Sequence, residues 1–295
     1  MISSFDSLTV DELTSELRSI GYVANRGLAT SLLISMKLGR PILLEGEVGV
    51  GKTELAKSIS QLLGRTLIRL QCYEGIDTNQ ALYEWDYARQ MLAIRAMSGN
   101  EVSDKSVDDL FGSKFLIERP LLQAIKAGDQ CVLLIDEVDR ADDEFEAFLL
   151  ELLSDFQITI PEIGTIAATS RPIVILTSNR TRELHDALKR RCLYNWIGFP
   201  AAEQEIEIIK SRVPGVSEQL ATKVIGTVNK LREMDLEKSP GVAETIDWVQ
   251  SLEAIGASSL NETNAAETLG AVIKGRDDLE YVSGNLAEIV SDASN

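Results

Sequence analysis

A glycine-rich segment constrains the fold of this chain more than any other feature of its sequence. Residues 46–53, Gly-Glu-Val-Gly-Val-Gly-Lys-Thr, fit the pattern G-x-x-x-x-G-K-[ST]. Glycines allow such a loop to curl until its backbone N–H groups surround phosphate oxygens, a path that side chains would block. An apolar run at 42–44 precedes the loop, and apolar residues at helical spacing follow it over 54–63. This order predicts a buried parallel strand, a phosphate-binding loop, and a helix whose positive end faces the phosphates.

The residues of this loop have separate expected roles. Lys52 would reach the β- and γ-phosphates of a nucleotide, and Thr53 would hold Mg²⁺. We therefore expect ATP and Mg²⁺ as cofactors. The residues expected to contact them from this segment are Gly46, Glu47, Val48, Gly49, Val50, Gly51, Lys52, Thr53 and Glu54.

A second apolar run, at 131–135, ends in two acidic residues, Asp136 and Glu137. In a nucleotide site, Asp136 would hold the water shell of magnesium. Glu137 would polarise the attacking water as a general base. A strand followed by a solvated acidic loop is the alternative, because charge runs are usually solvated. The glycine loop upstream favours the nucleotide site, so the sequence predicts a chain that binds and hydrolyses ATP.

Polar residues also follow a third apolar run, at 173–176. Asn179 could reach the γ-phosphate or the attacking water, although an Asn here also fits a turn or a helix cap. Further on, Arg190 and Arg191 could stabilise the transferring phosphoryl group from a neighbouring subunit. Two basic residues in the last turn of a helix would equally complement its dipole. His185, the only histidine, leaves no metal cluster and no Ser–His nucleophile.

Apolar runs alternate with helical spacing along the first two thirds of the chain. We expect strands at 42–44, 66–71, 131–135 and 173–176, and helices at 28–37, 54–63 and 116–127. A hairpin is expected at 157–168, and Thr9 with Glu12 predicts a capping box at the start of an N-terminal helix. This alternation predicts an α/β fold with a parallel sheet flanked by helices. Beyond about residue 200 only helical spacing remains, which predicts a P-loop domain at 1–199 and a small helical lid domain at 200–295.

Composition limits the partners and the compartment. The net charge is −17, and such a surface repels nucleic acid and anionic lipid, so nucleic acid is not an expected partner. The cysteines Cys72, Cys131 and Cys192 have no metal spacing, which suits buried thiols in a reducing cytosol. The N-terminus has neither a basic start nor an apolar core, and no apolar run reaches the roughly 18 residues of a membrane helix. We therefore expect a cytoplasmic protein without a signal peptide or a transmembrane segment.

Three other functions share parts of this pattern. A nucleic-acid motor or loader could use the same core, but the net charge of −17 disfavours it. A non-hydrolysing nucleotide switch or scaffold would not need Glu137. A small-molecule kinase would leave the C-terminal helical region unexplained.

These motifs together resemble the MoxR branch of the AAA+ ATPases, over roughly residues 17–255. The resemblance implies Walker A roles for Lys52 and Thr53, and Walker B roles for Asp136 and Glu137. It also implies that Asn179 is sensor 1 and that Arg191 is the arginine finger, with Arg190 as its rival. Residues 75–97 resemble the helix-2 insertion, and 157–168 the pre-sensor-1 hairpin, which would face the pore of a ring. The implied assembly is a homo-hexamer.

Two segments make the resemblance more specific. Residues 69–75, Arg-Leu-Gln-Cys-Tyr-Glu-Gly, and 81–87, Ala-Leu-Tyr-Glu-Trp-Asp-Tyr, are similar to the CoxD-type proteins. Those proteins are accessory factors in the maturation of molybdenum-containing carbon monoxide dehydrogenase. The implied partners are a client metalloenzyme precursor, which ATP hydrolysis would remodel, and a protein with a von Willebrand A-type domain.

One position departs from the family pattern. MoxR relatives often carry Ser-Pro-Arg in the small domain, and the arginine acts as sensor 2. Here residues 239–242 are Ser-Pro-Gly-Val, so no sensor 2 residue is expected. Coupling between the lid and the γ-phosphate must then differ from that pattern or be absent.

Overall fold

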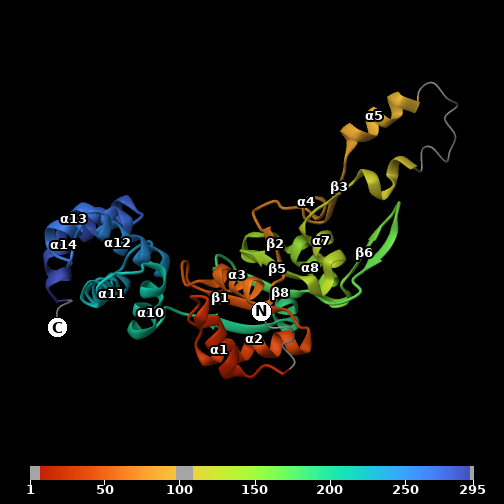
Figure 1. Cartoon of the computed structure of the whole chain (residues 1–295). Coiled ribbons are helices and arrows are strands. Elements are labelled where there is room, and N and C mark those ends of the chain that lie inside the picture. Colours follow the sequence, from red (N-terminus) through yellow and green to blue (C-terminus); the bar gives the residue numbers. More distant parts are fainter. Residues whose placement is uncertain (1–6, 98–108, 293–295) are drawn as a thin grey trace. The chain divides into compact units, whose positions relative to one another are not determined.

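The computed structural model describes residues 7–97 and 109–292 (Figure 1). It divides into two compact units. The sheet unit contains Met1–Leu13, Gly27–Glu45 and Ala56–Asn195, and the helical unit contains Thr14–Arg26, Gly46–Leu55 and Trp196–Asn295. Residues 1–6, on which the expectation of no signal peptide rests, lie outside the described residues. The predicted domain limits, 1–199 and 200–295, remain a prediction.

The sheet unit is built on a five-stranded sheet with the order β2-β5-β8-β1-β9. Its strands are β1 (Ile42–Gly46), β2 (Thr66–Gln71), β5 (Cys131–Asp136), β8 (Ile173–Ser178) and β9 (Leu193–Ile197). The strands β1, β5 and β8 are buried at every residue, as their unbroken apolar runs predict for a parallel sheet covered on both faces. The predicted α/β fold with a parallel sheet is confirmed.

The strand register places the polar ends of the central strands along one edge of the sheet. β2, β5, β8 and β1 are parallel, with Ile135 paired to Leu176 and Leu44 paired to Thr177. The next residues along β5 and β8, Asp136 and Thr177, therefore lie at the same level of the sheet. The chain passes from β1 directly into the loop 46–51. The residues that the sequence analysis singled out in β5 and β8 thus reach a common edge.

Helices cover this sheet, and the bounds of α2 and α3 are close to those expected. They are α2 (Arg26–Leu38), α3 (Lys52–Leu63), α7 (Pro120–Ala127), α8 (Asp143–Asp155) and α9 (Asp186–Arg191). The N-terminal helix α1 (Val10–Ser19) begins at the predicted capping box. The N–H of Thr9 donates to Glu12 at 2.8 Å, and the N–H of Glu12 donates to the Thr9 hydroxyl at 3.3 Å. The capping box is therefore confirmed.

One predicted helix is partly wrong. Helix α7 begins at Pro120, not at residue 116, and Leu116–Glu118 forms strand β4, which pairs antiparallel with β3 (Tyr83–Trp85). The helical conformation is disfavoured for a residue that precedes proline, and Arg119 is extended at φ −92° and ψ 170°. Pro120 then occupies the first helical position, which suits it.

Two projections leave the sheet unit. Residues 75–97 contain α4 (Thr78–Leu82), β3 and α5 (Tyr87–Met97), and the short 3₁₀ turns Asp109–Phe111 and Ser113–Phe115 follow later in the chain. Strands β6 (Gln157–Ile160) and β7 (Gly164–Ala167) form the expected hairpin. The predicted roles of these segments as a helix-2 insertion and a pre-sensor-1 hairpin remain predictions.

Over the described residues 202–292 the helical unit has only helices, as expected (Figure 1). They are α10 (Ala202–Arg212), α11 (Glu218–Glu233), α12 (Val242–Ala254), α13 (Glu262–Thr268) and α14 (Arg276–Asp292). Their core includes Val224, Trp248 and Leu286. Trp248 is fully buried, and its indole N–H donates to the Thr268 hydroxyl at 2.8 Å. None of the helices in the described residues combines the length and apolarity that crossing a membrane requires.

The three cysteines are free and buried, as expected of small apolar residues. Burial raises the pKa of Cys72 to about 12, and nearby carboxylates add to the shift. Burial likewise raises the pKa of Cys131 to about 11 and that of Cys192 to about 12. All three thiols therefore stay protonated at neutral pH.

The packing of Trp248 generates a stability prediction. Trp248→Ala should lower the free energy of unfolding by about 3–5 kcal/mol, because it opens a large cavity and leaves Thr268 without its donor. Chemical denaturation followed by circular dichroism measures the change. Tyr281→Ala, at a side chain with 52% exposure on α14, is the control. An equal loss in both variants would contradict the buried placement of Trp248.

Candidate functional site

The phosphate loop has the backbone that its glycines predict. Gly49 has φ +77° and Gly51 has φ +92°, a region that residues with a side chain rarely adopt. Lys52 is 6% exposed, and its ammonium donates to the carbonyl oxygens of Gly46 at 2.7 Å and Glu47 at 2.6 Å. The loop thus encloses a buried cation, so its residues fit a nucleotide phosphate.

The remaining loop residues occupy different environments. Val48 is exposed and Val50 is buried, and Thr53 is half-buried in the first turn of α3. Glu54 forms an ion pair with Arg212 of α10 at 2.6 Å. Its carboxylate thus faces a protein cation, which was not expected from the sequence. A contact of Glu54 with nucleotide would require its backbone rather than its paired carboxylate.

In the sheet unit, Asp136 is 2% exposed and both of its carboxylate oxygens are held. The Thr177 hydroxyl donates to Oδ1 at 2.6 Å. Arg69, on the neighbouring strand β2, donates to Oδ2 from Nε at 3.0 Å and from Nη2 at 2.5 Å. The carboxylate of Asp136 is therefore fixed in orientation at the end of β5. The sequence predicts that this residue helps to bind magnesium.

Glu137 follows in a left-handed conformation, with φ 53° and ψ 50°. Its N–H donates to the Thr177 hydroxyl oxygen at 2.9 Å, so Thr177 bonds to both acidic residues. The Glu137 carboxylate accepts from Arg140 at 3.1 Å. A non-glycine residue in this region costs free energy and is found mainly where the surroundings impose it, often at functional sites. The backbone strain at Glu137 supports a functional position for its side chain.

The turn after β8 is bonded to the turn after β5 through Asp139. Asp139 is 1% exposed, and its Oδ2 accepts from the N–H of Asn179 at 3.2 Å and the N–H of Thr181 at 2.8 Å. The Thr181 hydroxyl donates to the same oxygen at 2.7 Å. Asn179 is therefore held beside the acidic turn by its backbone.

The two candidate arginines lie at the end of α9. Leu188 of this helix is buried, whereas Arg190 and Arg191 are exposed. Within residues 7–97 and 109–292, neither guanidinium forms an ion pair or contacts Asp136, Glu137 or Asn179. The Arg190 carbonyl accepts from Arg40 at 3.0 Å. The structure brings the acidic residues and Asn179 together and leaves both arginines outside that network.

Three residues that hold the acidic residues and Asn179 were not predicted from the sequence to do so. Arg69 and Asp139 were not candidate site residues, and Thr177 was not predicted to bond to both Asp136 and Glu137. Each depends on which strands or turns are neighbours. Thr177 was visible as a polar strand end, and Asp139 lies three residues beyond Asp136. The strand order that pairs them is not visible in one sequence.

Comparison with known proteins places the chain in a family. Residues 41–192, slightly more than half of the chain, match the sequence profile of the AAA domain, dynein-related subfamily. This segment runs from the strand before the phosphate loop to the end of α9, and so contains the phosphate loop, the acidic residues, Asn179 and both candidate arginines. The chain belongs to this AAA domain family. It is a P-loop ATPase that hydrolyses ATP and uses Mg²⁺.

Individual relatives are more distant. The chain is 24% identical over 206 residues to an uncharacterized protein of Staphylococcus saprophyticus, covering 68% of this chain and 71% of that protein. It is 32% identical over 146 residues to ClpL, an ATP-binding subunit of the ATP-dependent Clp protease of Staphylococcus aureus. That match covers 48% of this chain and 18% of ClpL. The structure of the RuvB Holliday junction branch migration motor of Thermotoga maritima superimposes on this chain with a TM-score of 0.47 at 16% sequence identity. The superposition covers 90% of this chain and 72% of the RuvB chain.

The double role of Thr177 generates a prediction. Thr177→Val keeps the shape of the side chain but leaves Asp136 Oδ1 and the Glu137 N–H without their buried partner. We expect kcat for ATP hydrolysis to fall about 10- to 100-fold, the usual effect of losing a partner that orients a metal-binding group. Steady-state kinetics with ATP measures this. Thr177→Ser retains the hydroxyl and should stay near wild type, and equal losses in both variants would contradict the proposed bonding role.

Proposed function

We propose that this chain is a MoxR-type AAA+ ATPase that forms a six-membered ring and uses ATP hydrolysis to remodel a client protein. The observation that carries the proposal is the separation described above. Thr177 bonds to both Asp136 and Glu137, and Asp139 in the same acidic turn accepts from the N–H of Asn179. In contrast, Arg190 and Arg191 project from α9 without an ion pair in the described part of the chain. An exposed arginine of this kind suits a site that a neighbouring subunit completes.

In the proposed reaction, water attacks the γ-phosphorus of ATP and the bond to the β–γ bridging oxygen breaks, giving ADP and phosphate. Mg²⁺, held by Thr53 and through water by Asp136, would neutralise charge on the phosphates. Glu137 polarises the attacking water and accepts its proton, and Asn179 helps to orient that water. Lys52 and the Arg191 of a neighbouring subunit bind the γ-phosphate oxygens. Glu137 must leave its bond to Arg140 for this step, and the 52% exposure of Arg140 makes that bond weak.

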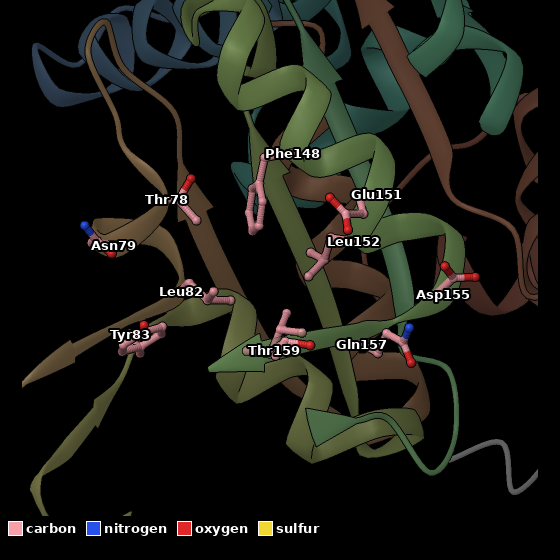
Figure 2. A pocket seen from close by; sticks show the side chains of 11 residues that line it. Thr78, Asn79, Leu82, Tyr83, Phe148, Glu151, Leu152, Asp155, Gln157 and Thr159 are labelled. Carbon is pink, nitrogen blue, oxygen red and sulfur yellow. The ribbon is translucent and has the colours of Figure 1, made fainter. Parts of the chain in front are cut away.

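A cavity of about 300 Å³ on the sheet unit offers a surface for a client (Figure 2). Figure 2 shows Leu82 and Tyr83 on one side of it, and Glu151 and Leu152 of α8 on the other. Leu82 and Leu152 are buried and form apolar walls, while Glu151 is exposed. The cavity lies at the base of residues 75–97 and beside β6, the two segments that would face a pore.

The charge of this cavity specifies what it would bind. Glu151 and Asp155 lie four residues apart in the last turns of α8, where like charges repel and the helix dipole disfavours acids. No basic residue occupies the last turn, and neither acid forms an ion pair among the described residues. Burial and then the charge of Glu162 raise the pKa of the nearby Tyr83. Unpaired acids beside apolar walls suit a client segment with Lys or Arg next to an apolar residue.

The proposed client is a metalloenzyme precursor in the cytoplasm, whose molybdenum-containing active site is completed after remodelling. The support is the similarity of residues 69–75 and 81–87 to CoxD-type proteins, together with the place of these segments. Leu82 and Tyr83 line the cavity, and Trp85 packs against Phe111 with ring centroids 5.4 Å apart. A protein with a von Willebrand A-type domain is the second proposed partner.

The subunit arrangement is tested by ATP hydrolysis per subunit as protein concentration rises. The wild type should show a steep rise, because a neighbour completes each site. Arg191→Ala should lower kcat by about 10³-fold or more, the scale of losing an arginine finger, and Arg190→Ala much less. Glu137→Gln sets the background rate. A flat rate per subunit that Arg191→Ala leaves unchanged would contradict the shared site.

The client surface is tested with two fluorescent decapeptides, one alternating Leu and Lys and the other Leu and Glu. The Leu–Lys peptide should bind to the wild type. The double variant Glu151→Lys and Asp155→Lys should bind this peptide about tenfold more weakly, or weaker still, because the charge of the cavity is reversed. The variant with Glu253→Lys and Glu262→Lys changes net charge equally at exposed positions elsewhere. Fluorescence anisotropy measures the affinity. Equal weakening in both double variants would mean that only overall charge matters.

A further inference from the structure

The apex of the phosphate loop contacts the start of α12, within the helical unit. The N–H of Val242 donates to the carbonyl oxygen of Gly49 at 3.1 Å. Val242 is the first residue of α12, and Gly241 is its N-cap. The loop and the helix are therefore joined main chain to main chain.

This contact, and not its own backbone conformation, requires glycine at position 241. Gly241 has φ −83° and ψ −177°, an extended conformation open to any residue. A Cβ at Gly241 would lie 2.7 Å from the carbonyl oxygen of Val48 and 2.8 Å from the Cα of Gly49. Both are backbone atoms, so no side-chain rotation could relieve the overlap. Any larger residue at position 241 must displace the loop or the helix.

The same segment is anchored to a buried ion pair. The carbonyl oxygen of Pro240 accepts from Arg232 Nε at 2.9 Å. Arg232 donates to both carboxylate oxygens of Glu205 at 2.8 Å, and the two side chains are 7% and 0% exposed. Thr245 of α12 also donates to Glu205, at 2.9 Å. A continuous set of contacts thus runs from the loop to α10, α11 and α12.

We propose that Gly241 and Val242 are positioning residues for ATP binding, which fix the phosphate loop by main-chain contact and couple its movement to the Arg232–Glu205 pair. A long side chain at position 241 would connect α12 to the nucleotide site. Here the main chain of Gly241 and Val242 makes the connection to the phosphate loop. An arginine at this position would have to occupy the space of the loop itself. The proposal rests on the proposed function, in which residues 46–53 hold the phosphates.

Three variants of the full chain test this, through ATP affinity by fluorescent-nucleotide titration and through steady-state kinetics. Gly241→Ala should raise the Kd and KM for ATP about tenfold, the scale of overpacking a tight contact, with a smaller change in kcat. Gly241→Arg should raise both further. Val242→Pro suits the first position of a helix but removes the N–H that bonds to Gly49, so it should raise KM while α12 is retained.

Gly270→Ala is the matched control, because a Cβ there would have no atom within 4 Å, and it should leave KM unchanged. Wild-type KM in Gly241→Ala, or tighter ATP binding in Gly241→Arg, would overturn the proposal. A lower melting temperature with unchanged KM would also overturn it, since the contact would then serve folding alone. Lys52→Ala separates the two hypotheses. If Lys52→Ala retained full ATP affinity, the assignment of residues 46–53 as the phosphate loop would fail. If Lys52→Ala lost ATP binding while Gly241→Ala bound ATP as the wild type does, only the positioning role of Gly241 would be refuted.

Discussion

The parallel pairing of β5 with β8 determines how the acidic residues at the carboxyl ends of these strands are oriented. Because Ile135 pairs with Leu176, the hydroxyl of Thr177 lies level with Asp136. One hydroxyl then donates to a carboxylate and accepts from the N–H of Glu137. A slip of one residue that brought Leu176 to this place would leave Asp136 and the N–H of Glu137 without their buried partner. The register of two apolar strands therefore controls the geometry of the acidic residues.

The two parts of the candidate nucleotide site are made rigid in different ways. The acidic edge is held by side chains, with Arg69, Thr177 and Asp139 each bonding across a strand or a turn. The phosphate loop is held by backbone, through its glycine conformations and the bond from Val242 to Gly49. The side-chain network depends on the chemistry of each residue, whereas the main-chain contact depends on the N–H of Val242 and on the absence of a Cβ at Gly241.

The sequence predicted those parts of the fold that depend on neighbouring residues in the chain. Apolar runs located β1, β5 and β8, and the Thr9–Glu12 spacing located the start of α1. Strand β9 was not predicted, because its residues alternate between half-buried and exposed and its bulky Tyr194 and Trp196 face outward. The strand at Leu116–Glu118 was predicted as helix because its partner β3 lies about thirty residues away. The bond between Arg69 and Asp136 requires the sheet order, which periodicity does not contain.

The burial of all three cysteines has a practical consequence for following this ATPase in motion. Their thiols stay protonated and shielded, so electrophilic labelling reagents, which react with thiolates, do not modify them. A single cysteine placed at an exposed position such as Tyr281 on α14 would then carry a fluorescent dye selectively, with the native cysteines left in place. A second dye on the exposed Leu92 of α5 would report the distance between the two units through the catalytic cycle. The natural chain is thus already suited to site-specific labelling.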